Sequence, residues 1–156
     1  MVVEGNGQLP DVYKATYDSE GNLETETAYA WQKDTIIGFL LNNAPTAPYY
    51  TYYITDVYVS EGIKGTGKNS FAYLPSLKNV ELASSVEKLG EGTFTFSGIE
   101  TITIPNTVKE IGSMAFSSTL LRTITIPNST VITGGSTLGG CEQLVSVTLP
   151  TNIVKI

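Results

Sequence analysis

The chain has 156 residues, 41% of them hydrophobic, which suits one ordinary domain with a sizeable core. Its 9 Lys and Arg residues and 15 Asp and Glu residues give a formal net charge of −6. Because nucleic acids and anionic membranes attract clustered cations, this charge argues against both as partners. No stretch has the roughly 18 consecutive apolar residues of a membrane helix, so we expect no membrane insertion.

Few residue types are available for catalysis. The chain has no histidine, so nucleophiles that need a histidine base, and histidine metal sites, are impossible. Carboxylate pairs remain possible, but most acids fall on expected turns and not in a cleft. Residues 62–69 differ by one residue from a phosphate-binding loop, because Asn69 stands where a hydroxyl should hold magnesium. We therefore predict that the protein is not an enzyme and has no cofactor and no bound metal.

Residues 1–48 contain no repeat, and we expect them to form an N-terminal cap rich in β-structure. Residues 1–12 contain Gly, Asn and Pro as breakers and are predicted to be a flexible or extended lead-in. Residues 12–17 and 23–29 are two β-prone runs around a short polar segment with a glycine. This arrangement predicts a β-hairpin.

The second half of the cap is less well determined. Residues 30–42 contain a short apolar run that could be a buried strand or a short helix, and we favour the strand. Two prolines in residues 43–48 indicate a loop or linker. We place the boundary there, because the first coil of the solenoid that follows needs a cover over its apolar face.

Residues 49–156 are organised around a repeat that is clearest in Ile99–Phe116. With Ile99 as position zero, apolar residues stand at positions three, five, nine and twelve, a glycine at thirteen and a phenylalanine at seventeen. Copies that start near residues 54, 77, 99, 121 and 144 are 23, 22, 22 and 23 residues apart, although those from 54 and 121 are weaker. A near-constant period of this length predicts a solenoid, here of about five coils.

Each repeat opens with alternating side chains, as in Thr101–Ile104, which predicts a short strand with buried isoleucines and exposed threonines. Prolines would end three of these strands: Pro105, Pro127 and Pro150. The glycine at position thirteen suits either a positive φ or a close approach between backbones. On the far side of the coil we expect a row of stacked rings: Phe71, Phe94 and Phe116.

The repeat resembles the BspA-like leucine-rich repeats, also called the Treponema pallidum type, of bacterial and some protist surface proteins. The best copies are IETITIPNTVKEIGSMAF and LVSVTLP, and Cys141 stands where the family places a cysteine. The resemblance covers about two thirds of the chain. It implies a right-handed coil with a parallel β-sheet on the concave face, a secreted or cell-surface location, and roles in adhesion or protein binding.

The concave face is the predicted partner-binding site, because its curvature presents many coils to one ligand. Its candidate residues lie between the buried ones: Asp56, Tyr58, Asn79, Glu81, Thr101, Thr103, Thr123, Thr125, Ser146 and Thr148. They grade from acidic and aromatic residues to a ladder of hydroxyls. Threonine also suits an exposed strand that binds nothing, and the sequence leaves both interpretations open.

A run of tyrosines is a second candidate site, for glycans: Tyr49, Tyr50, Tyr52 and Tyr53. Exposed tyrosines stack on sugars or anchor interfaces. The same rings would also serve as apolar packing under a cap, and the sequence does not separate these roles.

We therefore expect a non-catalytic bacterial protein, secreted or on the cell surface, that binds a host, neighbouring-cell or matrix protein in adhesion. The alternatives are a glycan-binding module and a structural spacer of a longer surface protein. No export signal is visible at the N-terminus. We expect the natural protein to continue beyond Ile156, because the last coil has no polar terminal repeat.

Overall fold

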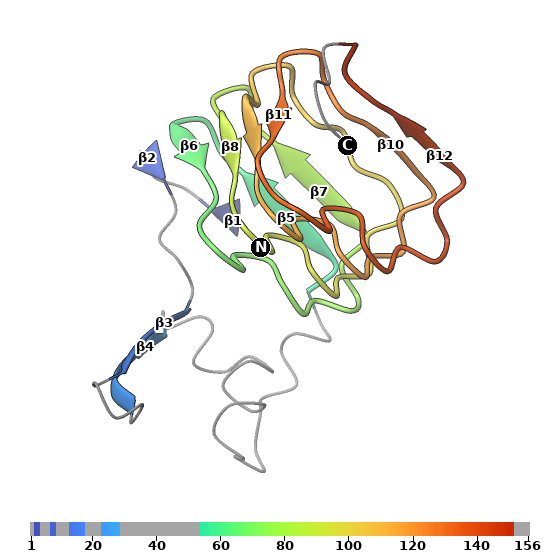
Figure 1. Ribbon diagram of the computed structural model, residues 1–156. Helices are drawn as coiled ribbons and strands as arrows, with labels where there is room; N and C mark the ends of the chain where they lie inside the picture. Colours follow the sequence, from blue (N-terminus) through green and yellow to red (C-terminus); the bar gives the residue numbers. More distant parts are fainter. Residues whose placement is uncertain (1, 4–6, 9–12, 18–22, 29–53, 152–156) are drawn as a thin grey trace.

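The computed structural model describes residues 2–3, 7–8, 13–17, 23–28 and 54–151. Residues 54–151 form a β-solenoid of about four turns with parallel sheets, and no helix occurs among the described residues (Figure 1). Four coils begin at residues 54, 77, 99 and 121, and the first strand of a further coil follows residue 144. The predicted fold class, a leucine-rich-repeat solenoid, is confirmed.

Two rows of short parallel strands run along the solenoid (Figure 1). The first row, near the start of each coil, consists of β5 (Asp56–Val59), β7 (Asn79–Leu82), β10 (Thr123–Thr125) and β12 (Ser146–Thr148). The second row consists of β6 (Ile63–Gly65), β8 (Lys88–Leu89), β9 (Glu110–Ile111) and β11 (Val131–Ile132). In the first row β5 pairs with β7 and β10 with β12, whereas the second row is continuous.

The first row is interrupted in the third coil, where the strand predicted over Thr101–Ile104 is absent. The side chains alternate as expected, because Thr101 and Thr103 are exposed and Ile104 is buried. Among the described residues, however, no backbone hydrogen bond joins this segment to β7 or β10. Alternation reports which side chains are buried, and it does not report whether backbone groups reach a partner. The strand prediction was wrong for that reason.

Two strands from the N-terminal segment extend both rows. β1 (Val2–Val3) pairs in parallel with β5, and β2 (Gly7–Gln8) pairs in parallel with β6. The lead-in predicted over residues 1–12 is therefore extended at these four residues and hydrogen-bonded to the first coil. Its backbone groups satisfy part of the edge that the first coil would otherwise leave open.

The hairpin predicted from residues 12–17 and 23–29 is confirmed. β3 (Tyr13–Tyr17) and β4 (Leu23–Ala28) pair in antiparallel register, with an irregularity between Thr16 and Tyr17. The strand favoured for residues 30–42 and the boundary at 43–48 lie outside the described residues. The capping role of residues 1–48 stays a prediction.

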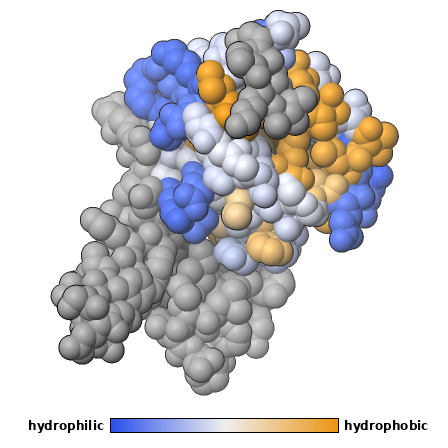
Figure 2. Space-filling model, in the orientation of Figure 1, coloured by the Kyte–Doolittle hydropathy of each residue, from blue (hydrophilic) through white to orange (hydrophobic). Residues whose placement is uncertain are grey.

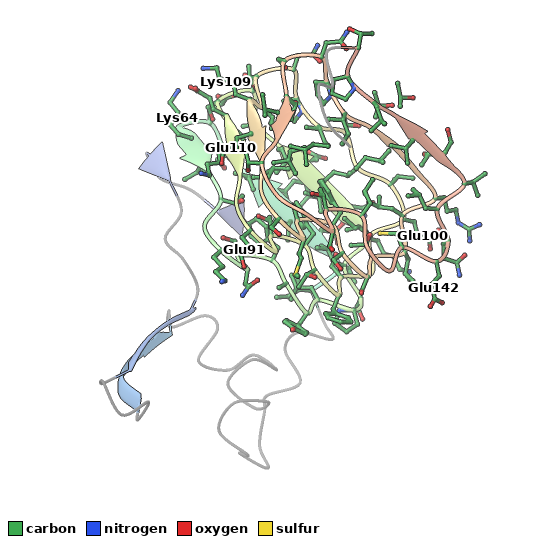
Figure 3. The ribbon with its side chains drawn as sticks, viewed as in Figure 1. Lys64, Glu91, Glu100, Lys109, Glu110 and Glu142 are labelled. Carbon is green, nitrogen blue, oxygen red and sulfur yellow. The ribbon has the colours of Figure 1, made fainter. Side chains whose placement is uncertain are left out.

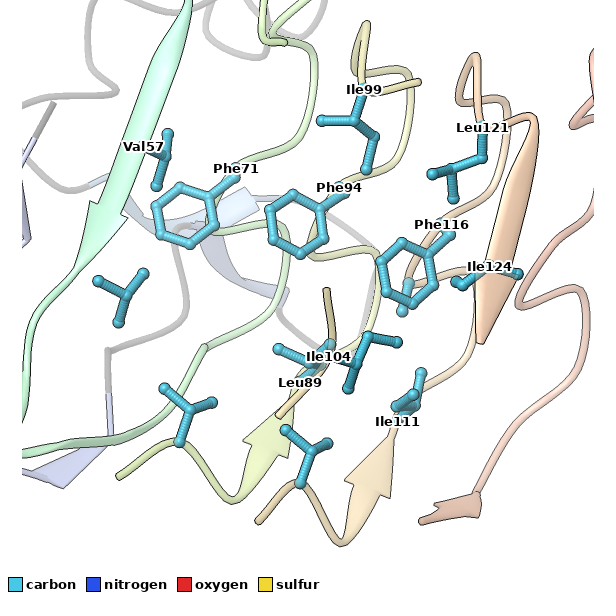
Figure 4. Packing of buried hydrophobic residues seen from close by; sticks show 14 of the residues in the cluster. Val57, Phe71, Leu89, Phe94, Ile99, Ile104, Ile111, Phe116, Leu121 and Ile124 are labelled. Atoms are coloured by element: carbon cyan, nitrogen blue, oxygen red, sulfur yellow. The ribbon is translucent and has the colours of Figure 1, made fainter. Parts of the chain in front are cut away.

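The core is built around a row of phenylalanine rings at position seventeen, as predicted. The ring centroids of Phe71 and Phe94 lie 5.5 Å apart, and those of Phe94 and Phe116 lie 5.6 Å apart (Figure 4). All three rings are fully buried. Aliphatic side chains from the rest of each coil complete the core: Val57, Leu89, Ile99, Ile104, Ile111, Leu121 and Ile124. Each coil thus covers the apolar face of its neighbours, which a single coil cannot do for itself.

Backbone hydrogen bonds join the turns that carry these rings. The amides at positions fifteen, seventeen and nineteen of one coil donate to the carbonyls at positions fourteen, sixteen and eighteen of the next. Between the first two coils the bonds run from Asn69 to Glu91, from Phe71 to Thr93 and from Tyr73 to Thr95, each with a nitrogen–oxygen distance of 2.8 Å. The next two pairs of coils repeat the three bonds at distances from 2.7 to 3.2 Å. The turns therefore carry a continuous ladder along the solenoid.

This turn places two residues of each coil in the left-handed backbone region, at positions fifteen and nineteen. Their φ angles lie between 55° and 71° in Asn69, Tyr73, Gly92, Phe96, Met114, Ser118, Ser136 and Gly140. Left-handed φ favours glycine, and a bulky residue there is strained. Glycine stands at only two of these positions, so the ladder is formed at some cost in backbone strain.

The glycine at position thirteen serves a close approach between coils, and its φ is not positive. A Cβ on Gly90 would lie 2.6 Å from the carbonyl oxygens of Thr66 and Gly67 in the preceding coil. A Cβ on Gly112 would lie 2.7 Å from the amide nitrogen of Glu91. Of the two roles expected for this glycine, close backbone approach is the one observed.

Replacement of Phe94 by alanine is expected to lower the free energy of unfolding by about 3 to 5 kcal/mol, because the removed ring is fully buried between two others and leaves a cavity. Urea denaturation followed by circular dichroism would measure the change. Met114→Ala is the control, since its side chain is exposed and its loss should change the free energy by less than about 0.5 kcal/mol. Equal losses in the two variants would contradict a core centred on the rings.

Replacement of Gly90 by alanine is expected to cost about 1 to 3 kcal/mol, because the new methyl group would collide with backbone carbonyls that cannot move aside. Gly135→Ala is the matched control, since a Cβ there meets nothing within 4 Å. Thermal denaturation should show a lower melting temperature for the first variant alone. A similar melting temperature for both variants would contradict the close approach at position thirteen.

Candidate functional site

The ten residues predicted to bind a partner lie at positions two and four of their coils, and we call them the strand face. Nine of them are exposed, and Asp56 is half-buried. The parallel register sets neighbours side by side: Asp56 with Asn79, Tyr58 with Glu81, Thr123 with Ser146, and Thr125 with Thr148. Thr101 and Thr103 are exposed between these pairs, in the coil without a strand. Nine of the ten residues are therefore exposed as the alternation indicated, and their role in binding stays a prediction.

Asp56 is fixed by two hydrogen bonds at the acidic end of the strand face. Thr55 Oγ1 donates to Oδ2 at 2.5 Å, and Asn79 Nδ2 donates to Oδ1 at 2.6 Å. The Thr55 hydroxyl, and after it the Asn79 amide, lowers the pKa of the Asp56 carboxyl from its ordinary value, because both bonds favour the charged form. Asp56 therefore holds the Asn79 side chain in place, and both of its oxygens are engaged.

Glu81 and Tyr58 lie next to this pair, and within the described part of the chain the Glu81 carboxylate is not held by hydrogen bonds as the Asp56 carboxylate is. The Tyr58 side chain is 39% exposed, and Glu81 is its partner on the adjacent strand. Among the described residues the Glu81 carboxylate makes no hydrogen bond and no ion pair. A free carboxylate beside an exposed phenol ring offers a partner both a charge and a surface for stacking.

Four other carboxylates of the described residues pair with a cation on a neighbouring coil. Glu87 lies between Lys64 at 3.5 Å and Lys109 at 2.6 Å. The remaining pairs are Lys68–Glu91, Lys88–Glu110 and Arg122–Glu100. Figure 3 shows Lys64, Lys109 and Glu110 gathered around the second row of strands. The Lys109 ammonium holds the pKa of the Glu87 carboxyl below its usual range. All of these ion pairs join neighbouring coils.

An exposed aromatic pair at the turns was missed by the sequence analysis. Tyr73 and Phe96 stand at position nineteen of the first two coils, with ring centroids 5.2 Å apart and planes inclined by 18°. The Phe96 side chain is 54% exposed, and Tyr73 is half-buried. The sequence does hold a signal, because Gly140 at the same position of the fourth coil indicates a turn that favours glycine. Aromatic residues are unexpected at such a position.

Apolar side chains gather at the end of the solenoid that carries β12, in the view of Figure 2. They include Val145, which is 84% exposed, and Leu149. Nothing in the described part of the chain shows what covers these side chains. We assign no function to them.

The tyrosine run predicted as a glycan site lies outside the described residues: Tyr49, Tyr50, Tyr52 and Tyr53. Within the described ranges, no three His, Cys, Asp or Glu side chains are grouped so that they could hold a metal ion. The same part of the chain contains no long apolar helix that could cross a membrane.

Comparison with protein families gives a match over residues 45–156 to six copies of the BspA type leucine rich repeat region. Comparison with curated proteins gives no match. Among solved structures, a leucine-rich repeat protein from Bacteroides ovatus is 28% identical, with a TM-score of 0.59 over 62% of this chain and 25% of that chain. The T. pallidum leucine rich repeat protein is 26% identical, with a TM-score of 0.57 over 62% of this chain and 46% of that chain.

A leucine-rich repeat protein from Eubacterium ventriosum shows the same fold over more of the chain. It is 20% identical, with a TM-score of 0.56 over 94% of this chain and 38% of that chain. The chain spans less than half the length of each of these three proteins. The likeness therefore extends to a part of each of them.

Replacement of Thr55 by valine is expected to raise the pKa of Asp56 towards its ordinary value, and Asn79→Ala is expected to raise it by less, because the Thr55 bond is the larger cause of the shift. Because folding lowers this pKa, the bonds add stability above the unfolded pKa, and that stability is lost as the pH falls through the folded pKa. NMR titration of the Asp56 carboxyl carbon measures this pKa in each variant. Thr125→Val is the control and should leave the pKa unchanged. An unchanged pKa in both Thr55→Val and Asn79→Ala would contradict the hydrogen bonds.

Proposed function

The chain belongs to the BspA-type leucine-rich repeat family, and from this membership and the strand face we propose that it binds a protein partner without catalysis. The observation that carries the proposal is the free Glu81 carboxylate beside the exposed ring of Tyr58. The paired carboxylates show that this solenoid uses its acids for contacts between coils, and in the described ranges the Glu81 carboxylate makes no such contact. A partner would supply the missing contacts.

The rest of the strand face supports the same proposal. It holds two carboxylates and no cation among its ten residues, so it presents a weakly negative surface. Asp56 and Asn79 are already fixed by their mutual hydrogen bond, which reduces the entropy lost when a partner binds. The hydroxyls of the later coils, from Thr101 to Thr148, add hydrogen-bonding groups along the face.

The proposal includes the absence of catalysis. The chain has no histidine, so a histidine base is not available. Glu87, Glu91, Glu100 and Glu110 are engaged in ion pairs across coils.

The proposed location is the cell surface or the extracellular space, and the proposed partner is a protein of a host cell, a neighbouring cell or the extracellular matrix. Family membership and the absence of a basic patch support this proposal. Because the chain spans less than half of its solved relatives, a spacer role within a longer surface protein is the second proposal. The glycan-binding alternative at Tyr49–Tyr53 rests on the sequence alone.

The test begins with capture of partners by the purified protein from extracts of host-surface and matrix proteins, followed by their identification by mass spectrometry. The dissociation constant of an identified partner is then measured for the variant Tyr58→Ala with Glu81→Gln. We expect binding to weaken by about tenfold or more, because an aromatic anchor and a charged contact are lost together. The melting temperature should stay the same, since both side chains are exposed.

Glu142→Gln is the matched control, because this carboxylate is also exposed but does not belong to the strand face; Figure 3 labels its position. It should leave the affinity unchanged. Equal weakening in the control would assign the attraction to overall charge, and an unchanged affinity in the double variant would remove Tyr58 and Glu81 from the site. Capture of no protein would favour the spacer.

A further inference from the structure

The stacked pair of Tyr73 and Phe96 lies at the turns, away from the strand face. The two rings continue the spacing of the coils, with centroids 5.2 Å apart. Unlike the buried row of Phe71, Phe94 and Phe116, this pair reaches the surface, and Phe96 is 54% exposed. A second aromatic row therefore begins on the outside of the turns and extends over two coils.

The backbone makes aromatic residues costly at this position. Tyr73 has a φ of 58° and Phe96 a φ of 55°, in the left-handed region that disfavours bulky side chains by about 1 kcal/mol or more. Gly140 takes the same place in the fourth coil with a φ of 71°, which shows that the turn forms with glycine. Stacking on Tyr73 and partial burial offset part of this strain, but more than half of the Phe96 surface stays exposed. The exposed part of the ring is therefore available for a contact outside the chain.

The outer aromatic row stops at Phe96, because Ser118 and Gly140 follow it along the solenoid. A Cβ on Gly140 would lie 2.8 Å from Ser118 Oγ and 3.6 Å from Ser118 Cα. The Ser118 hydroxyl therefore extends towards the space that a side chain at residue 140 would occupy. Among the described residues, that hydroxyl makes no hydrogen bond. On the side of Phe96 opposite Tyr73, the next residue of the row is therefore the small Ser118, whose hydroxyl can still donate and accept hydrogen bonds.

Thr95 and Ser117 do not add hydrogen-bonding capacity, because their hydroxyls already donate to the carbonyls of Ser117 and Gly139. The free chemistry at this point is therefore the Phe96 ring and the Ser118 hydroxyl.

We propose that Phe96 and Ser118 form a glycan-binding site, in which a pyranose ring stacks on Phe96 as the next member of the outer row. A pyranose has a face made of C–H groups, which packs on an aromatic ring, and hydroxyls at its rim, which pair with a free serine hydroxyl. An aromatic side chain of a protein partner would stack on Phe96 but would leave the Ser118 hydroxyl without a partner. Neither the Phe96 ring nor the Ser118 hydroxyl carries a charge, which fits a neutral sugar.

This site shares no residue with the strand face, so it goes beyond the proposed function and can fail independently of it. It also differs from the glycan site predicted at Tyr49–Tyr53. Variants of the three surfaces therefore distinguish the three possibilities in one set of measurements.

The test uses the full chain on an array of animal, plant and bacterial oligosaccharides, followed by measurement of the dissociation constant of the glycan with the strongest signal. We expect Phe96→Ala to weaken binding by about tenfold, because stacking on an aromatic ring is lost. Ser118→Ala should weaken it by about threefold, through loss of one neutral hydrogen bond. Met114→Ala is the matched control, since Met114 is also exposed, apolar and left-handed in φ, and it should bind as the unchanged protein does.

A structural role for the pair is tested separately with Phe96→Gly, whose melting temperature should not fall because glycine relieves the strained φ. A lower melting temperature with unchanged glycan affinity would overturn the proposal. An array without signal would overturn it too, as would equal weakening by Met114→Ala. Loss of binding in Tyr52→Ala but not in Phe96→Ala would move the site to the tyrosine run, and preferential binding of tryptophan peptides would assign the ring to a protein partner.

Discussion

The ladder of backbone hydrogen bonds between successive turns is the constraint on which the rest of the molecule depends. It sets position fifteen, seventeen and nineteen of each coil beside the same positions of the next coil, with bonds such as Phe71 to Thr93 at 2.8 Å. Because the register is held in this way, every side chain meets its own equivalent one repeat later. Phenylalanine therefore stacks on phenylalanine, and close packing at Gly90 and Gly112 recurs at each step.

The same register has the opposite effect on exposed positions, where equal side chains in successive coils are disfavoured if they are charged. Identical charges at one position would be stacked about 5 Å apart, which is unfavourable, so the charge has to alternate from coil to coil. Lys64, Glu87 and Lys109 show this alternation along one row. The repeat is consequently strict where side chains are buried and variable where they are exposed. Groups outside this pattern, such as Glu81 beside Tyr58, are the ones for which coil pairing provides no explanation.

The buried rows could be predicted because buried positions carry the same residue types at a regular spacing in the sequence. The stack of Phe94 with its neighbours follows from the repeat period of 22 or 23 residues, as does the position of the strand face. It did not allow prediction of hydrogen bonding, so Thr101–Ile104 alternates like a strand without being one. The pair of Tyr73 and Phe96 was missed because the left-handed φ at position nineteen leaves no periodic mark in residue type, apart from Gly140. The spacing of residue types in the sequence indicates which side chains are buried, but it indicates the φ angles and the pairing of strands only in part.

Four of the residues that carry the two proposals lie on the first two coils, and Ser118 lies on the third. Tyr58 and Tyr73 belong to the first coil, and Glu81 and Phe96 to the second, on the strand side and the turn side of one ring-filled core. The repeat copy that starts at residue 54 is also among the least regular, whereas the regular third coil exposes mainly threonines on its strand side. A solenoid tolerates such local departures because each coil contacts only its neighbours. For this reason we place both proposed binding sites at residues that depart from the repeat.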